Sequence, residues 1–384
     1  MKKINLLVDA RIFGGEGQGT LTYISGLYHA LLKNYGDDYN IYFASYDQAA
    51  VKKHFKKECI HFIPLKSRNR LWLWLQEYPN LIRKYDIDFA HFQYITPFIK
   101  NCRFIVTTHD VLFNDFAESF SMTYAQMRNI LFKHSLKNSD IRLTVSEYSK
   151  NAIHRHYGIP TESIQVTPNA PMDIYLKKID RQKSKALVQQ KYGLQQYILY
   201  VSRIEKRKNQ LQLLKAYTEL KLSEHNIQLV FVGNDTLNYE AFSAQIKNLK
   251  GQDRTNVHWI SDWVSNEDLT HIYNAAQLFV YPSKAEGYGI PPIESAVLGI
   301  NTICSKATAM QDYHFFGDNH IDTDNLELLK ACILKNLRNP TPDNALQKIA
   351  QTIQQKYTWN HSATVLHQNI LQLQMAAHTK KVAI

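Results

Sequence analysis

The chain has 384 residues, of which 45 % are hydrophobic and 21 % are charged, and its formal net charge is +11. This length fits two domains of about 100–200 residues each, and the composition is that of an ordinary globular protein. The positive charge favours an anionic partner, but Lys and Arg are spread along the chain and form no basic stripe, so we do not expect nucleic acid binding.

Cysteine use indicates a reducing compartment, and the hydropathy pattern predicts neither a signal peptide nor a transmembrane helix. The cysteines are scattered, without a CxxC pair, which argues against a disulfide framework and a structural zinc site; they are Cys59, Cys102, Cys304 and Cys332. Residues 1–3 run directly into a strand-like segment, so we expect no signal peptide. No stretch approaches about 18 uninterrupted apolar residues, so we expect no transmembrane helix. The expectation is a cytoplasmic protein, with room for peripheral contact at the inner face of the membrane.

Short apolar runs alternate with longer helical patterns from one end of the chain to the other. This alternation is typical of parallel sheets built from βαβ units and predicts an α/β fold. The strands predicted in the first half are residues 4–8, 41–44, 60–64, 89–92, 104–108, 142–145 and 164–166.

A glycine-rich loop follows the first predicted strand. It has four glycines in six positions, Gly14, Gly15, Gly17 and Gly19. Such a loop can fold tightly over a phosphate or a sugar, with the N-terminus of the next helix behind it. The spacing does not match GxGxxG and no Gly-Lys-Ser/Thr follows, so neither a dinucleotide fingerprint nor a P-loop is supported. An ordinary surface turn is the alternative.

Residues 66–75 combine three cationic side chains with Trp72 and Trp74. A basic aromatic helix of this kind can lie on an anionic membrane surface. More often such a stripe packs against its own sheet, and we favour this second interpretation.

His109 directly follows the predicted strand at 104–108. Ligands in open α/β sheets bind at the carboxyl ends of the strands, and this is where the sequence places the imidazole. A ligand contact and a structural role are both open for His109.

A polar, lysine-rich stretch at 173–185 predicts a linker, with a first domain at 1–172, a second at 186–355 and a closing helical segment at 356–384. The second half repeats the alternation of strands and helices. Its predicted strands are residues 197–201, 229–232, 257–260, 278–281 and 302–304.

A basic element follows the first strand of the second half. It has four cations in six residues between a strand end and a helix start, Arg203, Lys206, Arg207 and Lys208. Point charges, guanidinium geometry and the helix dipole act together there, which predicts a diphosphate site. A solvated charged turn is the alternative.

The segment from Glu286 to Glu294 predicts a strand end, a glycine turn and a helix. Gly287 and Gly289 flank Tyr288 and allow the backbone to approach a ligand closely. Two prolines then suit the first turn of a helix, whose free N–H groups can meet polar oxygens. The two carboxylates can therefore face one cleft at the carboxyl end of a parallel sheet.

Together these stretches resemble the retaining glycosyltransferases of family 4. The most specific part is the Glu-x7-Glu element from Glu286 to Glu294, followed by the basic element at 202–209. The glycine loop, His109-Asp110 and the helix around Trp359 fit as well. The resemblance implies the GT-B architecture, in which two Rossmann-like doubly wound domains face each other across a cleft. The first would bind the acceptor, the second would bind the nucleotide sugar, and residues 356–384 would cross back to the first.

The resemblance also implies roles for individual residues. Arg203 and Lys208 would hold the leaving diphosphate, Glu294 the ribose, and Glu286 the donor sugar. The implied catalytic residues are His109, Arg203, Lys208 and Glu286. The implied donor-binding residues are Gly15, Gly17, Gly19, Arg203, Lys208, Gly287, Tyr288, Gly289, Ile290 and Glu294.

The implied reaction moves a hexose, with retention, from a GDP-mannose-like or other NDP-hexose donor to a glycan or lipid-linked acceptor of a bacterial surface polysaccharide. Cations at the phosphate and a carboxylate near the sugar both favour its transition state, so no cofactor and no metal are expected. The sequences 86–88 and 322–324 do match the Asp-x-Asp pattern of metal-dependent transferases. The first lies at the entry of a strand and the second in a late loop, so we expect no metal there.

Two departures from the family pattern bear on the prediction. Asn169-Ala170-Pro171 replaces a common Asn-Gly, and Ser261-Asp262-Trp263 replaces a common glycine in a region that usually lies beside the base, which leaves the nucleotide open. A nucleotide-sugar epimerase of the same fold is an alternative, although it does not explain the Glu-x7-Glu element. A non-catalytic binding module is another, against which the intact set of implied catalytic residues argues.

Overall fold

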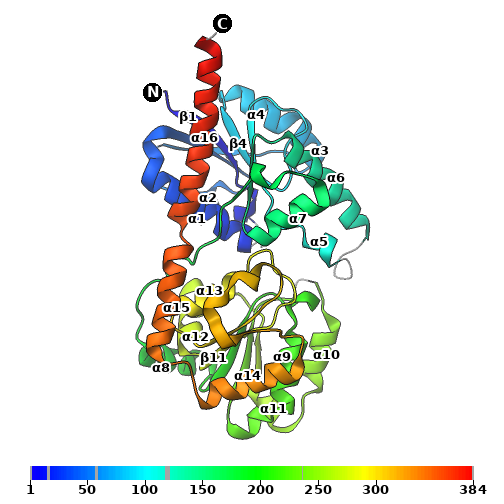
Figure 1. Cartoon of the computed structure of the whole chain (residues 1–384), viewed down its shortest axis with the longest axis vertical. Helices are drawn as coiled ribbons and strands as arrows, with labels where there is room; N and C mark the ends of the chain where they lie inside the picture. Colours follow the sequence, from blue (N-terminus) through cyan, green and yellow to red (C-terminus); the bar gives the residue numbers. More distant parts are fainter. Residues whose placement is uncertain (1, 15–17, 57–58, 117–121, 236, 383–384) are drawn as a thin grey trace. The chain divides into compact units, whose positions relative to one another are not determined.

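The computed structural model describes residues 2–14, 18–56, 59–116, 122–235 and 237–382 (Figure 1). Its contacts divide the chain into two compact units, one formed by Met1–Ala170 with Thr358–Ile384 and the other by Pro171–Tyr357. Within the described ranges, no helix is both long enough and apolar enough to cross a membrane.

The first unit is built on a parallel sheet with the strand order β3-β2-β1-β4-β5-β6-β7. Its strands are β1 Ile4–Asp9, β2 Tyr39–Ser45, β3 Ile60–Pro64, β4 Phe89–Gln93, β5 Arg103–Thr107, β6 Ile141–Thr144 and β7 Ile164–Val166. Its helices are α1 Gln18–Tyr35, α2 Gln48–His54, α3 Arg70–Trp72, a π-helical turn Leu73–Glu77, α4 Tyr78–Lys84, α5 Leu112–Asp115, α6 Met122–Asn138, α7 Glu147–Tyr157 and α16 Trp359–Val382. Every residue of β1 is buried, as expected for a strand covered on both faces.

The closing helix α16 packs on α1 inside this first unit. Gly26 makes the close approach possible, because a Cβ at this position would lie only 2.1 Å from Cε2 of Trp359. The Ser362 hydroxyl also donates to the carbonyl of Pro168 at 2.8 Å. The last segment of the chain is therefore part of the unit that contains its beginning.

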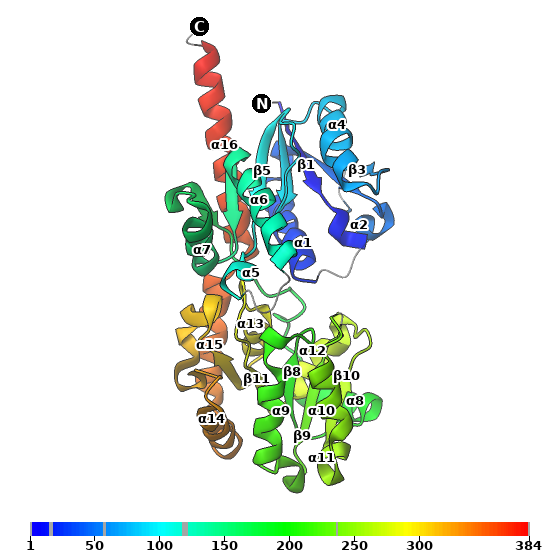
Figure 2. The same ribbon diagram turned by 90° about the vertical axis from the view of Figure 1, so that its right-hand side faces the viewer.

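The second unit has a parallel sheet with the order β10-β9-β8-β11-β12-β13. Its strands are β8 Tyr197–Val201, β9 Gln228–Val232, β10 Val257–Ile260, β11 Leu278–Tyr281, β12 Thr302–Ser305 and β13 His320–Ile321. Its helices are α8 Arg181–Tyr192, α9 Gln210–Glu219, α10 Glu240–Asn248, α11 Gly251–Asn256, α12 Asn266–Ala275, α13 Ile290–Val297, α14 Leu326–Arg338 and α15 Asp343–Lys356. In Figure 2, α9, α10 and α11 lie beside the strands β8, β9 and β10.

Each strand expected from the sequence is present, within one or two residues at its ends, so the α/β prediction is confirmed. The two-residue strand β13 was not expected. Residues 181–185, which the sequence analysis placed in a linker, form the first turn of α8, whose N-cap Asp180 accepts a hydrogen bond from the amide of Gln182 at 2.8 Å. The sequence hid this helix because, within it, only Ser184 and Val188 are buried and no apolar period is visible.

The basic aromatic segment at 66–75 has two faces. Leu73 and Trp74 are buried in the core cluster beside β4, which confirms the predicted packing for these two side chains. The prediction is wrong for Leu71, Trp72 and Leu75, which are exposed to solvent.

Both sheets contain a topological switch point, where the strand order changes direction. It lies between β1 and β4 in the first unit and between β8 and β11 in the second. Ligands of open α/β sheets bind outside the carboxyl ends of the strands at such points. The loops that follow these four strands are therefore the first places to look for a site.

Candidate active site

The switch point of the second unit brings the two predicted motifs together. The basic element follows β8, the Glu286 element follows β11, and these two strands are hydrogen-bonded neighbours. The amide of Lys284 donates to the carbonyl of Arg207 at 2.8 Å, which joins the two loops directly.

The Glu286 carboxylate lies at the centre of a buried charge cluster. Its Oε1 atom is 2.6 Å from Nζ of Lys208 and accepts a hydrogen bond from the Tyr281 hydroxyl at 2.8 Å. Its Oε2 atom is 3.5 Å from Nη1 of Arg207. Glu286 and Lys208 are both buried. One carboxylate thus holds two cations at the switch point.

The charges of this cluster are mutually dependent. Burial alone would raise the pKa of Glu286, but Lys208 and then Arg207 outweigh it and bring that pKa down to about 2. Burial lowers the pKa of Lys208, and Glu286 opposes this shift. A buried ion pair contributes little net stability because both ions lose their hydration, so a cluster like this one indicates a functional site more than a structural brace.

Arg207 also belongs to this site, although the sequence analysis gave it no individual role. Its Nη1 group donates to the carbonyl of Ala285 at 2.7 Å, and its Nη2 group is 2.8 Å from Oε2 of Glu205. The other carboxylate oxygen of Glu205 is 3.2 Å from Arg203. The Arg203 side chain is 47 % exposed and that of Arg207 only 14 %. Arg203, Arg207 and Lys208 therefore form one row of cations, and the signal for Arg207 was its place in the same basic run.

Thr308 fixes the backbone of Glu286. Its hydroxyl accepts from the Glu286 amide at 2.8 Å and donates to the Glu286 carbonyl at 3.0 Å. Thr308 has a φ of 52°, a conformation that is strained for a β-branched residue by about 1–3 kcal/mol. The surrounding fold therefore holds a strained residue against the backbone of Glu286.

The glycine turn leads into α13 as expected. Gly289 is the N-cap of the helix with a φ of 94°, and a Cβ there would lie 2.7 Å from Cγ of Met310. The Tyr313 hydroxyl donates to the carbonyl of Tyr288 at 2.8 Å, and the ring of Tyr288 is buried. Ile290 is the first residue of the helix. The ring of Tyr288 is therefore part of the packing of this turn.

Glu294, on α13, has an environment opposite to that of Glu286. It is buried, the Tyr273 hydroxyl donates to its Oε2 at 3.4 Å, and the described residues place no cation within ion-pair distance of it. Burial raises the pKa of Glu294 to about 8, against the effect of the Tyr273 hydrogen bond. In this structure the two carboxylates of the Glu-x7-Glu element thus differ in charge at neutral pH.

We expect Glu294→Gln to flatten the pH dependence of stability. The folded protein holds a proton on Glu294 up to about pH 8 that the unfolded chain releases near 4.5, so the free energy of unfolding should fall as pH rises through this window. The Gln variant lacks this loss. Urea unfolding midpoints of the wild type and the variant at pH 5.5 and pH 8 measure this loss of stability. An equal fall in the midpoint of both proteins from pH 5.5 to pH 8 would contradict the raised pKa of Glu294.

In the first unit, His109 follows β5 beside the switch point. Its Nε2 atom is 2.7 Å from Oε1 of Gln93, and its ring packs edge-on to Tyr23 at 4.9 Å. Burial lowers the pKa of His109 to about 3, so the ring is neutral, and Nε2 carries the proton that the Gln93 oxygen accepts. Gly19 is exposed on α1, and Gly15 and Gly17 lie outside the described residues.

The Asp-x-Asp carboxylates are engaged by protein groups. Asp88 accepts from the Asn5 amide at 2.8 Å, while Asp324 is 2.9 Å from Nζ of Lys284 and accepts from Asn209 at 3.1 Å. Among the described residues, no group of three or more His, Cys, Asp or Glu side chains is placed to hold a metal ion.

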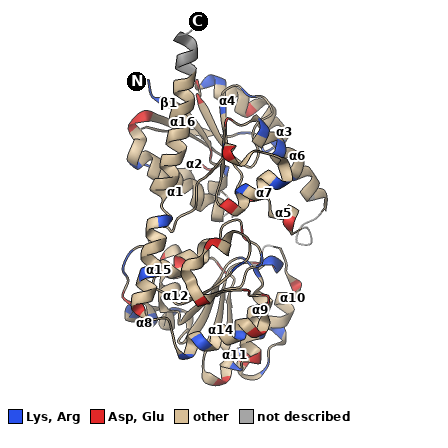
Figure 3. Ribbon diagram, in the orientation of Figure 1, with Lys and Arg blue, Asp and Glu red and all other residues tan. Residues whose placement is uncertain are grey.

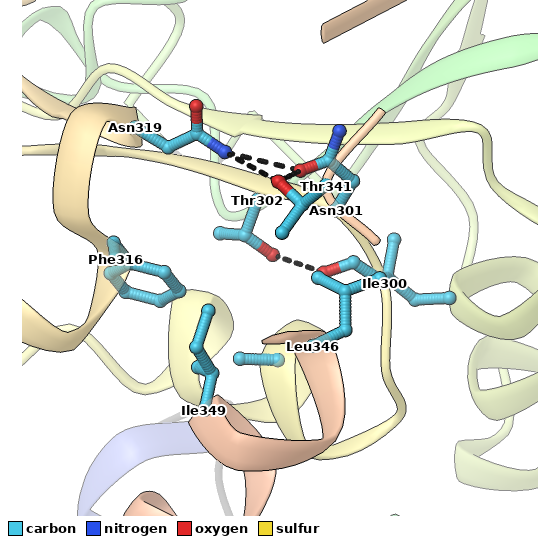
Figure 4. A pocket seen from close by; sticks show the side chains of 9 residues that line it. Ile300, Asn301, Thr302, Phe316, Asn319, Thr341, Leu346 and Ile349 are labelled. Carbon is cyan, nitrogen blue, oxygen red and sulfur yellow. Dashed lines mark hydrogen bonds between the residues drawn. The ribbon is translucent and has the colours of Figure 1, made fainter. Parts of the chain in front are cut away.

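A small cavity in the second unit lies apart from these loops. Asn301, Asn319 and Thr341 form a hydrogen-bonded network along its wall, as Figure 4 shows. Its volume is about 10 Å³, which is room for one water molecule. None of its lining residues belongs to the charge cluster, so this cavity is a packing feature and not the substrate site.

Two doubly wound α/β units with a charged switch point define the class, a two-domain fold of GT-B type. Two family models match the chain: "Glycosyltransferase Family 4" covers residues 19–170, and "Glycosyl transferases group 1" covers residues 182–355. The chain therefore belongs to the family 4, group 1 glycosyltransferases.

One relative is similar to this chain in sequence, and two solved structures are similar to it in fold. O-antigen chain mannosyltransferase B of Escherichia coli is 28 % identical over 270 residues, which are 68 % of each chain. Sucrose-phosphate synthase of Thermosynechococcus elongatus has 18 % identity and a TM-score of 0.75, covering 98 % of this chain and 100 % of its own. Anabaena HepE, solved with UDP and glucose, has 15 % identity and a TM-score of 0.71, with 96 % and 100 % coverage. The two structures confirm the fold.

Proposed function

We propose that this protein transfers mannose from GDP-mannose to a glycan or lipid-linked acceptor during bacterial surface polysaccharide synthesis, with retention and without a metal ion. The observation that carries the proposal is the buried cluster of Glu286, Lys208 and Arg207 at the switch point of the second unit. Membership of the glycosyltransferase family supplies the reaction class.

The row of cations fits the leaving group. When the bond between the sugar and the phosphate breaks, negative charge builds on the diphosphate, and fixed positive charges lower the energy of this state. Arg203 is exposed enough to meet phosphate oxygens, and Arg207 and Lys208 lie behind it. The N-terminus of α9, which begins at Gln210, adds its dipole to the same loop. These protein charges support a mechanism in which no metal bridges the diphosphate.

The carboxylate of Glu286 fits the sugar end of the reaction. Positive charge develops at the anomeric carbon, and an ionised carboxylate nearby stabilises it. With a pKa of about 2, Glu286 is ionised at any physiological pH. Lys208 has three N–H donors and can share them between Glu286 and a phosphate oxygen. Glu294, with its raised pKa, is proposed to bind the ribose hydroxyls. The neutral His109, whose Nε2 proton is held by Gln93, is proposed to accept a hydrogen bond from a sugar hydroxyl at Nδ1.

The choice of GDP-mannose rests on a relative that is named for mannosyl transfer. HepE was solved with UDP, so the base needs a test of its own. A thermal-shift comparison of GDP, UDP and dTDP decides it. GDP at about 100 times its Kd should stabilise the protein by about 2.7 kcal/mol, or several degrees in Tm, while the other two at equal concentration should shift it far less. A larger shift with UDP or dTDP would overturn the choice of GDP.

The reaction itself is tested by incubating the protein with GDP-mannose and membrane or glycan extracts and following the release of GDP. Release should proceed at the same rate in EDTA as in magnesium, and NMR of the product should show the anomeric configuration of the donor. Inverted product would remove the proposed retention, and loss of the rate in EDTA would remove metal independence. If no nucleotide were released from GDP-mannose or from any other nucleotide sugar, the proposed activity would be refuted.

A further inference from the structure

The first unit exposes an unusual amount of apolar surface on three segments. Seven of the twelve large apolar side chains that the described residues expose lie at 71–75, 99 and 122–130. Six of them, between 41 % and 72 % exposed, form what we call the apolar patch: Leu71, Trp72, Leu75, Ile99, Met127 and Ile130. Single exposed apolar residues are ordinary in any protein, but a cluster of this kind marks a contact surface.

Packing within the unit does not explain the exposure at 71–75. The helical stretch through α3, the π-helical turn and α4 already places Leu73, Trp74 and Tyr78 in the core. Leu71, Trp72 and Leu75 of the same stretch are exposed to solvent. A helix with apolar side chains all round is normally buried on every side, so this one lacks a cover on its outer face.

The three segments of the apolar patch are neighbours. The ring of Trp74 packs edge-on to that of Phe98, with the ring centroids 6.2 Å apart. The ring of Phe98 also packs on that of His134 in α6, with a centroid separation of 5.4 Å. Phe98 therefore joins the π-helical turn to α6, and Ile99 directly follows it. Figure 1 shows α3 and α6 on the same side of the first unit.

Cations surround this apolar surface. Lys66, Arg68 and Arg70 precede the first segment, and Lys133 and Lys137 follow Ile130 along α6; all five are exposed. Figure 3 marks the basic residues of α3 and α6 in blue. The sequence of α6 has no acidic residue. The acid nearest the first segment, Glu77, is engaged by the amides of Lys66 and Ser67 at 2.6 and 2.8 Å. The apolar patch is therefore rimmed by positive charge.

We propose that the apolar patch and its cations rest on the surface of a bilayer that contains anionic phospholipids. Trp72 and the aliphatic side chains would enter the boundary between headgroups and acyl chains, about 5–10 Å deep, while the Lys and Arg side chains reach lipid phosphates. The inference rests on the proposed function and deepens it, because it identifies the face of the enzyme that holds it where a lipid-linked acceptor is found.

The charge pattern selects the bilayer over a second copy of the chain. A two-fold contact through this face would bring the same cations of both copies together, and like charges across an interface are unfavourable. An anionic bilayer satisfies the cations and the apolar side chains at the same time. The net charge of +11 acts in the same direction.

The test uses the full chain and sedimentation with phosphatidylcholine vesicles, with and without about 30 % phosphatidylglycerol. The wild type should bind the anionic vesicles and leave the neutral ones largely unbound. The variant Leu71→Ser with Trp72→Ser should reduce the partition coefficient at least about ten-fold, and Arg68→Gln or Arg70→Gln should each reduce it about five-fold. Leu237→Ser, a 65 % exposed residue of the second unit, is the matched control and should bind as the wild type does.

Other outcomes overturn the inference. They are absence of binding to anionic vesicles, equal binding to neutral ones, patch variants that bind like the wild type, or a change from dimer to monomer in the patch variants by size exclusion. The GDP thermal shift without lipid separates this result from the proposed function, because the patch variants should keep the shift. If the wild type is stabilised by GDP but does not bind vesicles, only the membrane-surface proposal is refuted. If no nucleotide stabilises the wild type, the proposed function is refuted.

Discussion

Glu286→Gln should lower the turnover number for sugar transfer by about 10²–10³, the usual effect of removing one preorganised electrostatic group from an active site. Gln keeps the size of the side chain and removes its negative charge, and its amide accepts through one oxygen where the carboxylate accepts through two. Glu286 is ionised because Lys208 and Arg207 lower its pKa to about 2, and this charge is what a cationic sugar centre needs. The measurement is kcat with saturating donor and acceptor.

Nucleotide affinity should respond differently to the same change. Oε1 of Glu286 now occupies one donor direction of Lys208 at 2.6 Å, so the Gln variant frees positive charge for the diphosphate. We expect GDP to bind the variant at least as tightly as the wild type, by calorimetry. Glu219→Gln, which removes a surface carboxylate paired with Lys330, is the control and should leave both quantities unchanged. If Glu286→Gln kept full turnover, or lost turnover only through weaker GDP binding, the role given to Glu286 would be refuted.

The sequence was sufficient for the fold because parallel strands covered on both faces are continuous apolar runs. Residues 278–281 and 229–232 could be read as strands without knowledge of their neighbours, and the helical patterns between them required βαβ crossovers. The strand β13 has only two residues, too few for any period. The polar helix α8 was hidden because it packs through small side chains such as Ser184.

The position of the site was predictable, but the partners within it were not. Strand ends and glycine turns placed Lys208 and Glu286 at one sheet edge. Their roles depend on which side chains of the 3₁₀ turn at 206–208 turn inward, and the structure buries Lys208, half-buries Arg207 and leaves Lys206 exposed. Such a short turn has no periodic pattern. This is why Arg207, although it was counted in the basic element, received no individual role.

The environments of individual carboxylates also lie beyond the sequence. Glu286 and Glu294 are the same residue type in one motif, yet cations lower the pKa of the first and burial raises that of the second. Lys208, distant in sequence, lowers the pKa of Glu286, whereas Glu294, among the described residues, has only the Tyr273 hydrogen bond to oppose the effect of burial. The segment at 66–75 repeats the lesson, because its apolar side chains divide between the core and the surface.

Lys208→Met should have the largest combined effect on activity and stability. It removes a charge from the proposed diphosphate site, and we expect kcat/KM to fall about 10³-fold. It also leaves Glu286 buried with Arg207 at 3.5 Å as the nearest remaining cation, and breaking a buried ion pair on one side typically costs about 3–5 kcal/mol. Urea unfolding at pH 7 measures this cost.

The loss of stability caused by Lys208→Met should depend on pH. In the wild type, the depressed pKa of Glu286 contributes stability above the unfolded value of 4.5, which is lost as pH falls toward about 2. Without Lys208, burial opposes ionisation with less compensation, so the pKa of Glu286 should rise. The stability lost in the Met variant should then be smaller at pH 4 than at pH 7, where the carboxylate must remain charged.

The double variant Lys208→Met, Glu286→Gln separates structure from catalysis. It removes both members of the pair, so no uncompensated carboxylate remains, and the free energy of unfolding should recover most of what the single Met variant loses. Activity should stay at the level of the single variants or below, because a site that has lost both charges cannot stabilise either end of the breaking bond. Recovery of stability without activity assigns the ion pair to chemistry. If the double variant were as unstable as Lys208→Met alone, the lysine would be needed for packing instead, and its catalytic role would have to be judged from activity at matched stability.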